Sequence, residues 1–185
     1  MARLWIAGLL LAAAAPSSGL RAQERAEPFV VGGLARGTGA LREDTGEGWL
    51  VAGGVGFPLA SADGLAVLVS GSYARIPYEG GFNEAMNLTS ALGELRYRAP
   101  ADGSIRLYLQ GGAGLLVRQY DPGSIDTRAT AAIRPGFTAA GGLDLRAGPT
   151  AVLLGARFLS GADAGFVSLE GGLAFPRRPG GGGVP

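Results

Sequence analysis

Six charged residues share the polar faces of segments whose other face is apolar. They are Glu94, Arg96, Arg106, Asp144, Arg157 and Glu170. Carboxylates and guanidiniums can pair with one another, and carboxylates can also transfer protons. Burying an ion is costly unless it is paired, so mutual ion pairs are the chemistry we expect. Counting across the predicted turns places Glu170 diagonal to Arg157 and Glu94 diagonal to Arg106, which gives two candidate pairs.

Most enzymatic chemistry is excluded by composition. The sequence contains no His and no Cys. Histidine-based acid–base or triad chemistry therefore cannot operate. Without Cys the chain can form no disulfide and has no cysteine that could accept a lipid. A carboxylate pair could act alone, but no pair here has a placement that demands it. We therefore predict no enzymatic activity and no catalytic residue, cofactor or metal site.

The elements that would position these charges are strands, and the stretch 104–120 shows why. In "SIRLYLQGGAGLLVRQY" the odd positions from Ile105 to Val117 are all apolar or glycine, whereas the even positions include Arg106, Tyr108 and Gln110. Side chains of a strand alternate between two faces. We predict that the odd positions face lipid and the even ones face a packed interior.

Seven further segments alternate in the same way, which gives an even total of eight. The eight predicted strands are 28–36, 49–57, 65–75, 87–98, 104–120, 136–146, 151–159 and 166–175. No segment with a helical period remains to cover an apolar sheet face. The predicted fold is all-β, an eight-stranded antiparallel up-and-down transmembrane β-barrel, with the six charged residues as a lumen ion network.

The connections alternate in length. Long loops follow the odd-numbered strands, with the short "SGADAG" as an exception, and the short turns "PLASADG", "APADGS" and "AGPT" follow the even-numbered ones. Short periplasmic turns and long extracellular loops are typical of outer-membrane barrels.

Aromatic residues on the apolar faces gather at both ends of the predicted strands. An aromatic girdle at each membrane interface is typical of transmembrane barrels. The predicted girdle is Phe57, Tyr97 and Phe175 at the end with short turns, and Trp49, Tyr73 and Phe158 near the long loops.

The two ends of the chain lie outside the predicted barrel. Arg3 precedes the apolar run "LWIAGLLLAAAA", and "PSSGLRA" leads to a cleavage site after Ala22, which is the pattern of a secretory signal peptide over 1–22. We predict the barrel over 28–175 and a disordered Gly/Pro-rich tail over 176–185. Removing 1–22 leaves 14 basic and 15 acidic residues, a net charge of −1, and nothing in this balance suggests a nucleic-acid partner.

Three stretches carry a resemblance to a known family. "GELRYR" at 93–98, "LYLQGGAG" at 107–114 and the last strand closing on Phe175 resemble the small eight-stranded OmpA/OmpX-like outer-membrane barrels. The resemblance implies export to the cell outer membrane, and recognition by the barrel insertion machinery through the terminal strand ending at Phe175, although ten residues follow it here.

The function predicted from these observations is that of an outer-membrane β-barrel with a structural or surface-interaction role and a plugged, non-conducting lumen. The expected partners are outer-membrane lipid and the insertion machinery, the extracellular loop partner is unknown, and a monomer is expected. Two alternatives stay open: a soluble lipocalin-like periplasmic barrel that binds a small apolar ligand, and a narrow outer-membrane channel.

Overall fold

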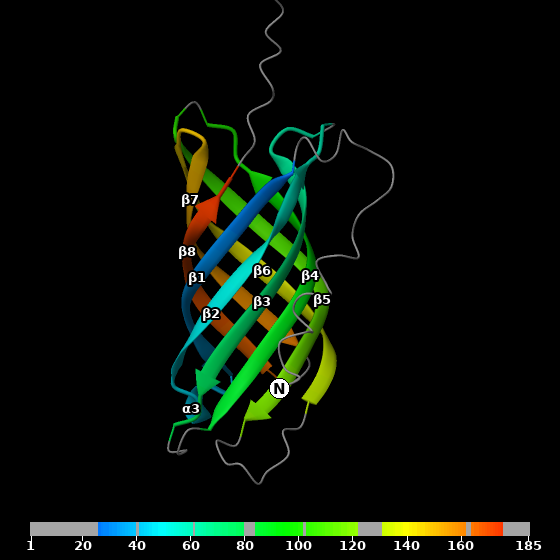
Figure 1. Cartoon of the computed structure of the whole chain (residues 1–185), viewed down its shortest axis with the longest axis vertical. Coiled ribbons are helices and arrows are strands. Elements are labelled where there is room, and N and C mark those ends of the chain that lie inside the picture. The colour runs from blue at the N-terminus through cyan, green and yellow to red at the C-terminus, as the bar shows by residue number, and fades with distance from the viewer. Residues whose placement is uncertain are drawn as a thin grey trace, which may run out of the picture.

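Eight antiparallel strands close into one barrel in the computed structural model, each strand pairing with its neighbours in sequence and the last with the first (Figure 1). The structure describes residues 26–39, 41–60, 62–79, 84–101, 103–121, 131–161 and 164–175. The predicted signal peptide and tail lie outside the described residues. The strands are β1 (Glu27–Thr38), β2 (Glu47–Pro58), β3 (Leu65–Pro77), β4 (Ala85–Arg98), β5 (Ile105–Asp121), β6 (Ala131–Ala147), β7 (Thr150–Gly161) and β8 (Ala164–Ala174).

The alternation of side chains predicted from sequence is confirmed in β5. Leu107 and Leu109 are 62% and 68% exposed on the outer surface, whereas Tyr108 and Gln110 are 6% and 5% exposed in the interior. Such a strand has its apolar face outside and its polar face inside. The barrel is therefore apolar on the surface that its surroundings contact.

The barrel closes through β1 and β8, which are antiparallel and in register from Phe29 opposite Ala174 to Thr38 opposite Gly165. The ladder continues one residue beyond β8, because the backbone N–H of Phe175 donates to the carbonyl oxygen of Pro28 at 2.9 Å. Closure leaves no free edge along the middle of the sheet.

The connections separate the two ends of the barrel as predicted. At the short-turn end, β6 and β7 are joined through Gly148 and Pro149 alone. At the opposite, long-loop end, the β1–β2 connection contains the short helix α3 (Leu41–Asp44), which lies at the lower end of the barrel in Figure 1. No helix among the described residues is long and apolar enough to cross a membrane.

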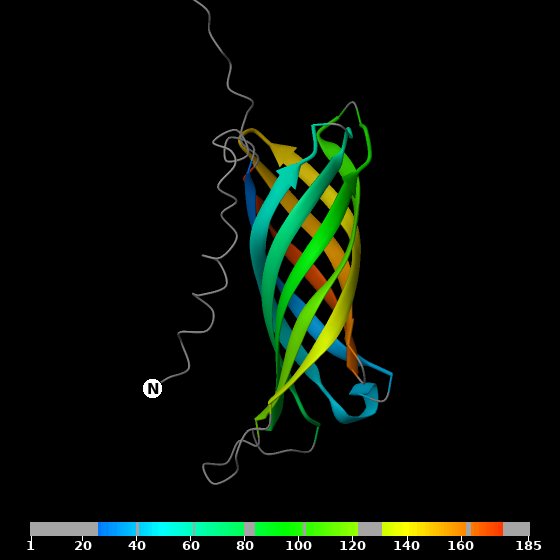
Figure 2. The same ribbon diagram turned by 90° about the vertical axis from the view of Figure 1, so that its right-hand side faces the viewer.

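Strand β6 begins earlier than the sequence predicted, at Ala131 instead of residue 136. The predicted start at residue 136 was wrong, because the strand continues through Pro135. Residues 131–135 pair with β5, but the pairing of β6 with β7 begins only at Phe137 opposite Ser160. Proline is tolerated where one side of a strand is unpaired. Residues 131–136, the β6 overhang, therefore lie outside the pairing of β6 with β7, at the long-loop end (Figure 2, yellow).

Candidate functional site: the lumen ion network

Arg157 of β7 is the centre of the interior charge network. Its Nε donates to Oε1 of Glu170 at 2.9 Å, and its Nη1 donates to Oε1 of Glu94 at 2.8 Å. The side chains of Arg157, Glu94 and Glu170 are 6%, 0% and 5% exposed. Gly155 stands opposite Glu170 in the β7–β8 register, so the Arg157–Glu170 pair has the diagonal geometry expected from sequence. One buried guanidinium thus pairs with two buried carboxylates.

Glu94 is held by donors from three other strands. Besides Arg157, Gln110 of β5 donates from Nε2 to Oε1 at 2.7 Å, and Ser70 of β3 donates to Oε2. Ser168 of β8 donates to the Glu170 oxygen that Arg157 also contacts. The network therefore crosses the lumen from β3, β4 and β5 to β7 and β8.

The second predicted pair, Glu94 with Arg106, does not form. In the β4–β5 register Glu94 stands opposite Gly112, while Arg106 lies beyond the last pair, Arg98 opposite Tyr108. The start of β5 pairs with β6 instead, which places Arg106 opposite Asp144. The count across the turn missed the stagger by which each strand of a tilted barrel is offset from the next.

Arg96 is positioned by rings and an amide. Its guanidinium carbon lies 5.1 Å from the centroid of the Phe29 ring and 5.1 Å from that of the Tyr108 ring. Its Nε donates to Oε1 of Gln110 at 2.8 Å. A cation over an aromatic face is stabilised, more strongly when water is removed. Gln110 therefore links Arg96 to Glu94 and joins two parts of the network.

A third group of charges lies toward the short-turn end. Arg98 of β4 approaches Oδ2 of Asp144 at 3.0 Å through Nε, and Oε2 of Glu27 at 2.7 Å through Nη1. Asp144 is 1% exposed. Oδ1 of Asp144 and Nε of Arg106 have no hydrogen-bond partner among the described residues. Arg98, and not Arg106, is thus the ion-pair partner of Asp144.

Sequence reasoning missed five members of this network: Ser70, Gln110, Arg98, Ser168 and Glu27. Alternation could have found four of them. Ser70, Gln110, Arg98 and Ser168 lie at positions that alternation places in the interior, but Ser and Gln carry no charge and Arg98 stood at a predicted strand end. Glu27 fell one residue outside the predicted strand 28–36.

Between the charges and the long loops the interior is filled by apolar side chains. Ile76, Met86, Leu88, Leu159 and Phe166 are each at most 1% exposed. Leu41 of α3 is buried at this end, and its carbonyl accepts a hydrogen bond from the hydroxyl of Thr45. Polar and apolar side chains thus both contribute to the packing of the lumen.

Gly155, which stands opposite Glu170 in the β7–β8 register, leaves room for an aromatic side chain. In the structure a Cβ at Gly155 would lie 2.4 Å from the hydroxyl of Tyr108 and 2.7 Å from the carbonyl oxygen of Gly141. The phenol of Tyr108 occupies that space, which brings its ring beside Arg96.

The six predicted girdle aromatics all lie on the outer surface. At the long-loop end the rings of Trp49 and Tyr73 are 5.4 Å apart, and Phe158 lies 6.3 Å from Phe137, an aromatic residue that the predicted girdle omitted. At the short-turn end Tyr97 and Phe175 are 44% and 42% exposed, and Phe57 is partly buried.

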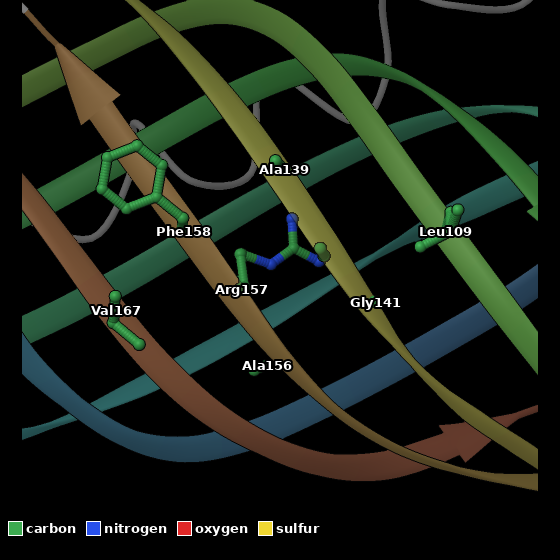
Figure 3. A pocket seen from close by; sticks show the side chains of 8 residues that line it. Leu109, Ala139, Gly141, Ala156, Arg157, Phe158 and Val167 are labelled. Atoms are coloured by element: carbon green, nitrogen blue, oxygen red, sulfur yellow. The ribbon is translucent and has the colours of Figure 1, made fainter.

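The outer surface has one shallow depression among the described residues that bears on the network. Figure 3 shows it over β6 and β7, where the small residues Ala139, Gly141 and Ala156 lie between Leu109, Phe158 and Val167. Its volume is about 350 Å³ and its lining is almost wholly apolar. Arg157 belongs to the same wall, but its side chain is buried in the lumen. No group of three or more acidic, His or Cys side chains within the described part of the chain could hold a metal ion.

Several solved structures share this architecture. Neisserial surface protein A superposes with a TM-score of 0.66 at 13% identity, covering 82% of this chain and 96% of that one. The fold is that of the small eight-stranded outer-membrane β-barrels. The N-terminal barrel domain of Pseudomonas aeruginosa OprF has a TM-score of 0.55 at 16% identity, covering 82% of this chain and 96% of that domain.

A third similar structure is the attachment invasion locus protein Ail of Yersinia pestis, solved in complex with the heparin analogue sucrose octasulfate. Its TM-score is 0.50 at 16% identity, covering 82% of this chain and 98% of Ail. No protein-family model matches the sequence, and no curated protein matches it. The similarity to these OmpA/OmpX-like barrels therefore rests on the fold.

Proposed function

We propose that this chain is an outer-membrane barrel with a plugged, non-conducting lumen and a structural or surface-interaction role. The observation that carries the proposal is the pairing of Arg157 with Glu94 and Glu170 across the lumen, at exposures of 6%, 0% and 5%. An eight-stranded barrel has an interior just wide enough for side chains. Paired charges and apolar side chains that fill this space leave no continuous path for a hydrated ion.

The polarity of the two surfaces supports insertion in a membrane. Leu34, Leu109 and Leu169 are 63%, 68% and 67% exposed on the outside, while the charged network is inside. Soluble proteins seldom expose large contiguous apolar patches. A soluble lipocalin-like barrel that binds an apolar ligand would need the reverse arrangement, so the membrane proposal is favoured over it.

Cell fractionation and gel mobility test the location. We expect the mature protein to partition with outer membranes and to migrate differently before and after boiling in detergent, because a closed barrel resists detergent until it is heated. Recovery wholly in the soluble periplasmic fraction would refute the membrane proposal and favour the lipocalin-like alternative.

Planar bilayer recordings test the plug. We expect the purified wild-type protein to show little steady conductance, and Arg157→Ala to raise it if opening the centre of the network admits water. Steady conductance of the wild-type barrel at porin-like levels would refute the plug and favour the narrow channel.

The remaining expectations belong to the same proposal. A cleaved signal peptide over 1–22 would direct export, the terminal strand ending at Phe175 would be read by the insertion machinery, and the barrel would work as a monomer in contact with outer-membrane lipid. We propose no nucleic-acid partner, no cofactor and no enzymatic activity. Ail was solved in complex with a heparin analogue, which supports the idea that a barrel of this fold can bind another molecule.

A further inference from the structure

Two arginines at the long-loop end lie on one face of neighbouring strands and have no ion-pair or hydrogen-bond partner among the described residues. Arg118 of β5 stands opposite Ala132, and Arg134 of the β6 overhang stands opposite Leu116. The two arginines are therefore diagonal neighbours, a placement that brings Cβ atoms within about 7–8 Å. Arg118 is partly exposed and Arg134 is exposed.

Both arginines lie on the strand face that lines the lumen deeper in the barrel. Leu116, the register partner of Arg134, is 3% exposed, and Leu88, the β4 partner of Arg118, is 1% exposed. Ile133, of opposite parity, is 69% exposed on the outer side. The guanidinium groups of Arg118 and Arg134 therefore overhang the mouth of the barrel above its apolar packing.

No described carboxylate neutralises this pair. The ion pairs among described residues involve Arg75, Arg98 and Arg157. Glu84, which lies at this end, accepts a hydrogen bond from the hydroxyl of Tyr120. Other rim arginines differ: Arg75 pairs with Asp121 at 3.3 Å, and Arg36 stands opposite Glu47. Arg118 and Arg134 thus form a local concentration of unpaired positive charge.

We propose that Arg118 and Arg134 form a binding site for a sulfate or phosphate ester of a soluble extracellular polyanion. The repulsion between two neighbouring cations is offset when one anion binds to both of them. A guanidinium binds a sulfate or phosphate group through two parallel hydrogen bonds, and a sulfate ester or phosphate monoester has three terminal oxygens, enough to serve both arginines. A carboxylate, with two oxygens, is matched by one arginine.

The direction in which Arg118 and Arg134 point indicates where their anionic ligand comes from. Lipid headgroups surround the outer surface of a barrel, on the side where Ile133 points. Arg118 and Arg134 occupy the opposite face, over the mouth, so the ligand approaches from outside the cell along the barrel axis. This inference rests on the proposed outer-membrane function and names the ligand class for its surface role.

The test uses short-chain dextran sulfate as the probe and neutral dextran as its control, with the mature protein in nanodiscs of zwitterionic phospholipid. We expect calorimetry to detect salt-sensitive binding of dextran sulfate only. Arg118→Gln and Arg134→Gln should each weaken binding about tenfold or more, since a charge-assisted hydrogen bond is removed. The matched variant Arg36→Gln removes the same charge from the outer face at this end and should change affinity less than about threefold, because an exposed charge at a distance is screened.

Three outcomes would overturn the inference. If the wild-type protein binds no dextran sulfate, the site does not exist. If Arg36→Gln and Arg118→Gln lose affinity for dextran sulfate equally, the binding is a diffuse electrostatic attraction and not a site. If a variant that carries both Arg118→Gln and Arg134→Gln loses binding only to vesicles that contain anionic lipid, the arginines serve a lipid headgroup. The boiling shift and bilayer conductance of the same protein test the plugged-barrel proposal separately from the anion site. A folded, non-conducting barrel that does not bind dextran sulfate contradicts the anion site alone.

Discussion

Replacing Arg157 by alanine tests the lumen ion network at its centre. The substitution removes the partner of both Glu94 and Glu170, whose side chains are 0% and 5% exposed. Removing one partner of a buried ion pair leaves an uncompensated charge and costs about 3–5 kcal/mol. Ser70 and Gln110 still donate to Glu94, so we expect the lower part of that range.

The assay is reversible urea unfolding in phospholipid vesicles, followed by tryptophan fluorescence. The sequence has two Trp residues, Trp5 and Trp49, so removal of 1–22 leaves Trp49 as the single reporter. The matched control is Arg146→Ala, which removes an exposed arginine at the short-turn end. A surface change of this kind is expected to alter the unfolding free energy by about 0.5 kcal/mol or less.

A neutral version of the network separates the charge effect from packing. Arg157→Met combined with Glu94→Gln and Glu170→Gln keeps the volume and removes all three charges. Such replacements are often neutral or stabilising, so the triple variant should regain most of the stability lost in Arg157→Ala. The reasoning is refuted if Arg157→Ala costs no more than Arg146→Ala, or if the triple variant is as unstable as the single one.

Three further substitutions test the two faces of the barrel. Leu109→Arg puts a charge on a side chain that is 68% exposed on the outside and should cost about 2–4 kcal/mol near the bilayer midplane, whereas a tolerated Leu109→Arg in vesicle unfolding would contradict the outward assignment. Gly155→Ala forces a Cβ to within 2.4 Å of the Tyr108 hydroxyl and should cost about 1–3 kcal/mol by overpacking; adding Tyr108→Phe should recover part of this, and no recovery would implicate the backbone contact instead. Arg98→Ala leaves Asp144, which is 1% exposed, without its ion-pair partner and should cost about 3 kcal/mol, while an unchanged urea midpoint would show that Asp144 is satisfied otherwise.

The architecture was predictable because one observable, the alternation of side chains, reports directly on which face meets which medium. Leu107 and Leu109 are outside and Tyr108 and Gln110 inside, as the sequence order requires. Strand ends were less predictable. Proline normally stops a ladder, but β6 continues past Pro135 on the β5 side, where Pro135 stands opposite Leu115, while its pairing with the described part of β7 begins only at Phe137.

Partners across the lumen were predictable only where the hairpin is short. The tight β7–β8 connection made the count from Arg157 to Glu170 reliable. Around the longer β4–β5 turn the count failed, and Glu94 turned out to face Arg157 from across the barrel. Contacts between non-adjacent strands depend on tilt and stagger, which no pairwise count along the chain contains.

The charged interior also limits which registers the strands can adopt. Because the side-chain period of a strand is two, a slip of one residue moves every side chain to the other face. In β4 such a slip would transfer Glu94 and Arg96 from the interior to the outer surface and bring Leu95, now 53% exposed, inside. A charge facing lipid costs about 2–4 kcal/mol at the midplane, and the slip would also break the contacts to Arg157 and Gln110. The neutral triple variant removes Glu94 from this penalty and breaks the contacts to Arg157, although Arg96 remains. We therefore expect it to regain most of the wild-type stability yet to refold into vesicles with a larger misfolded fraction, measured by the boiling shift, and equal refolding yields would show that the three charges do not select the register.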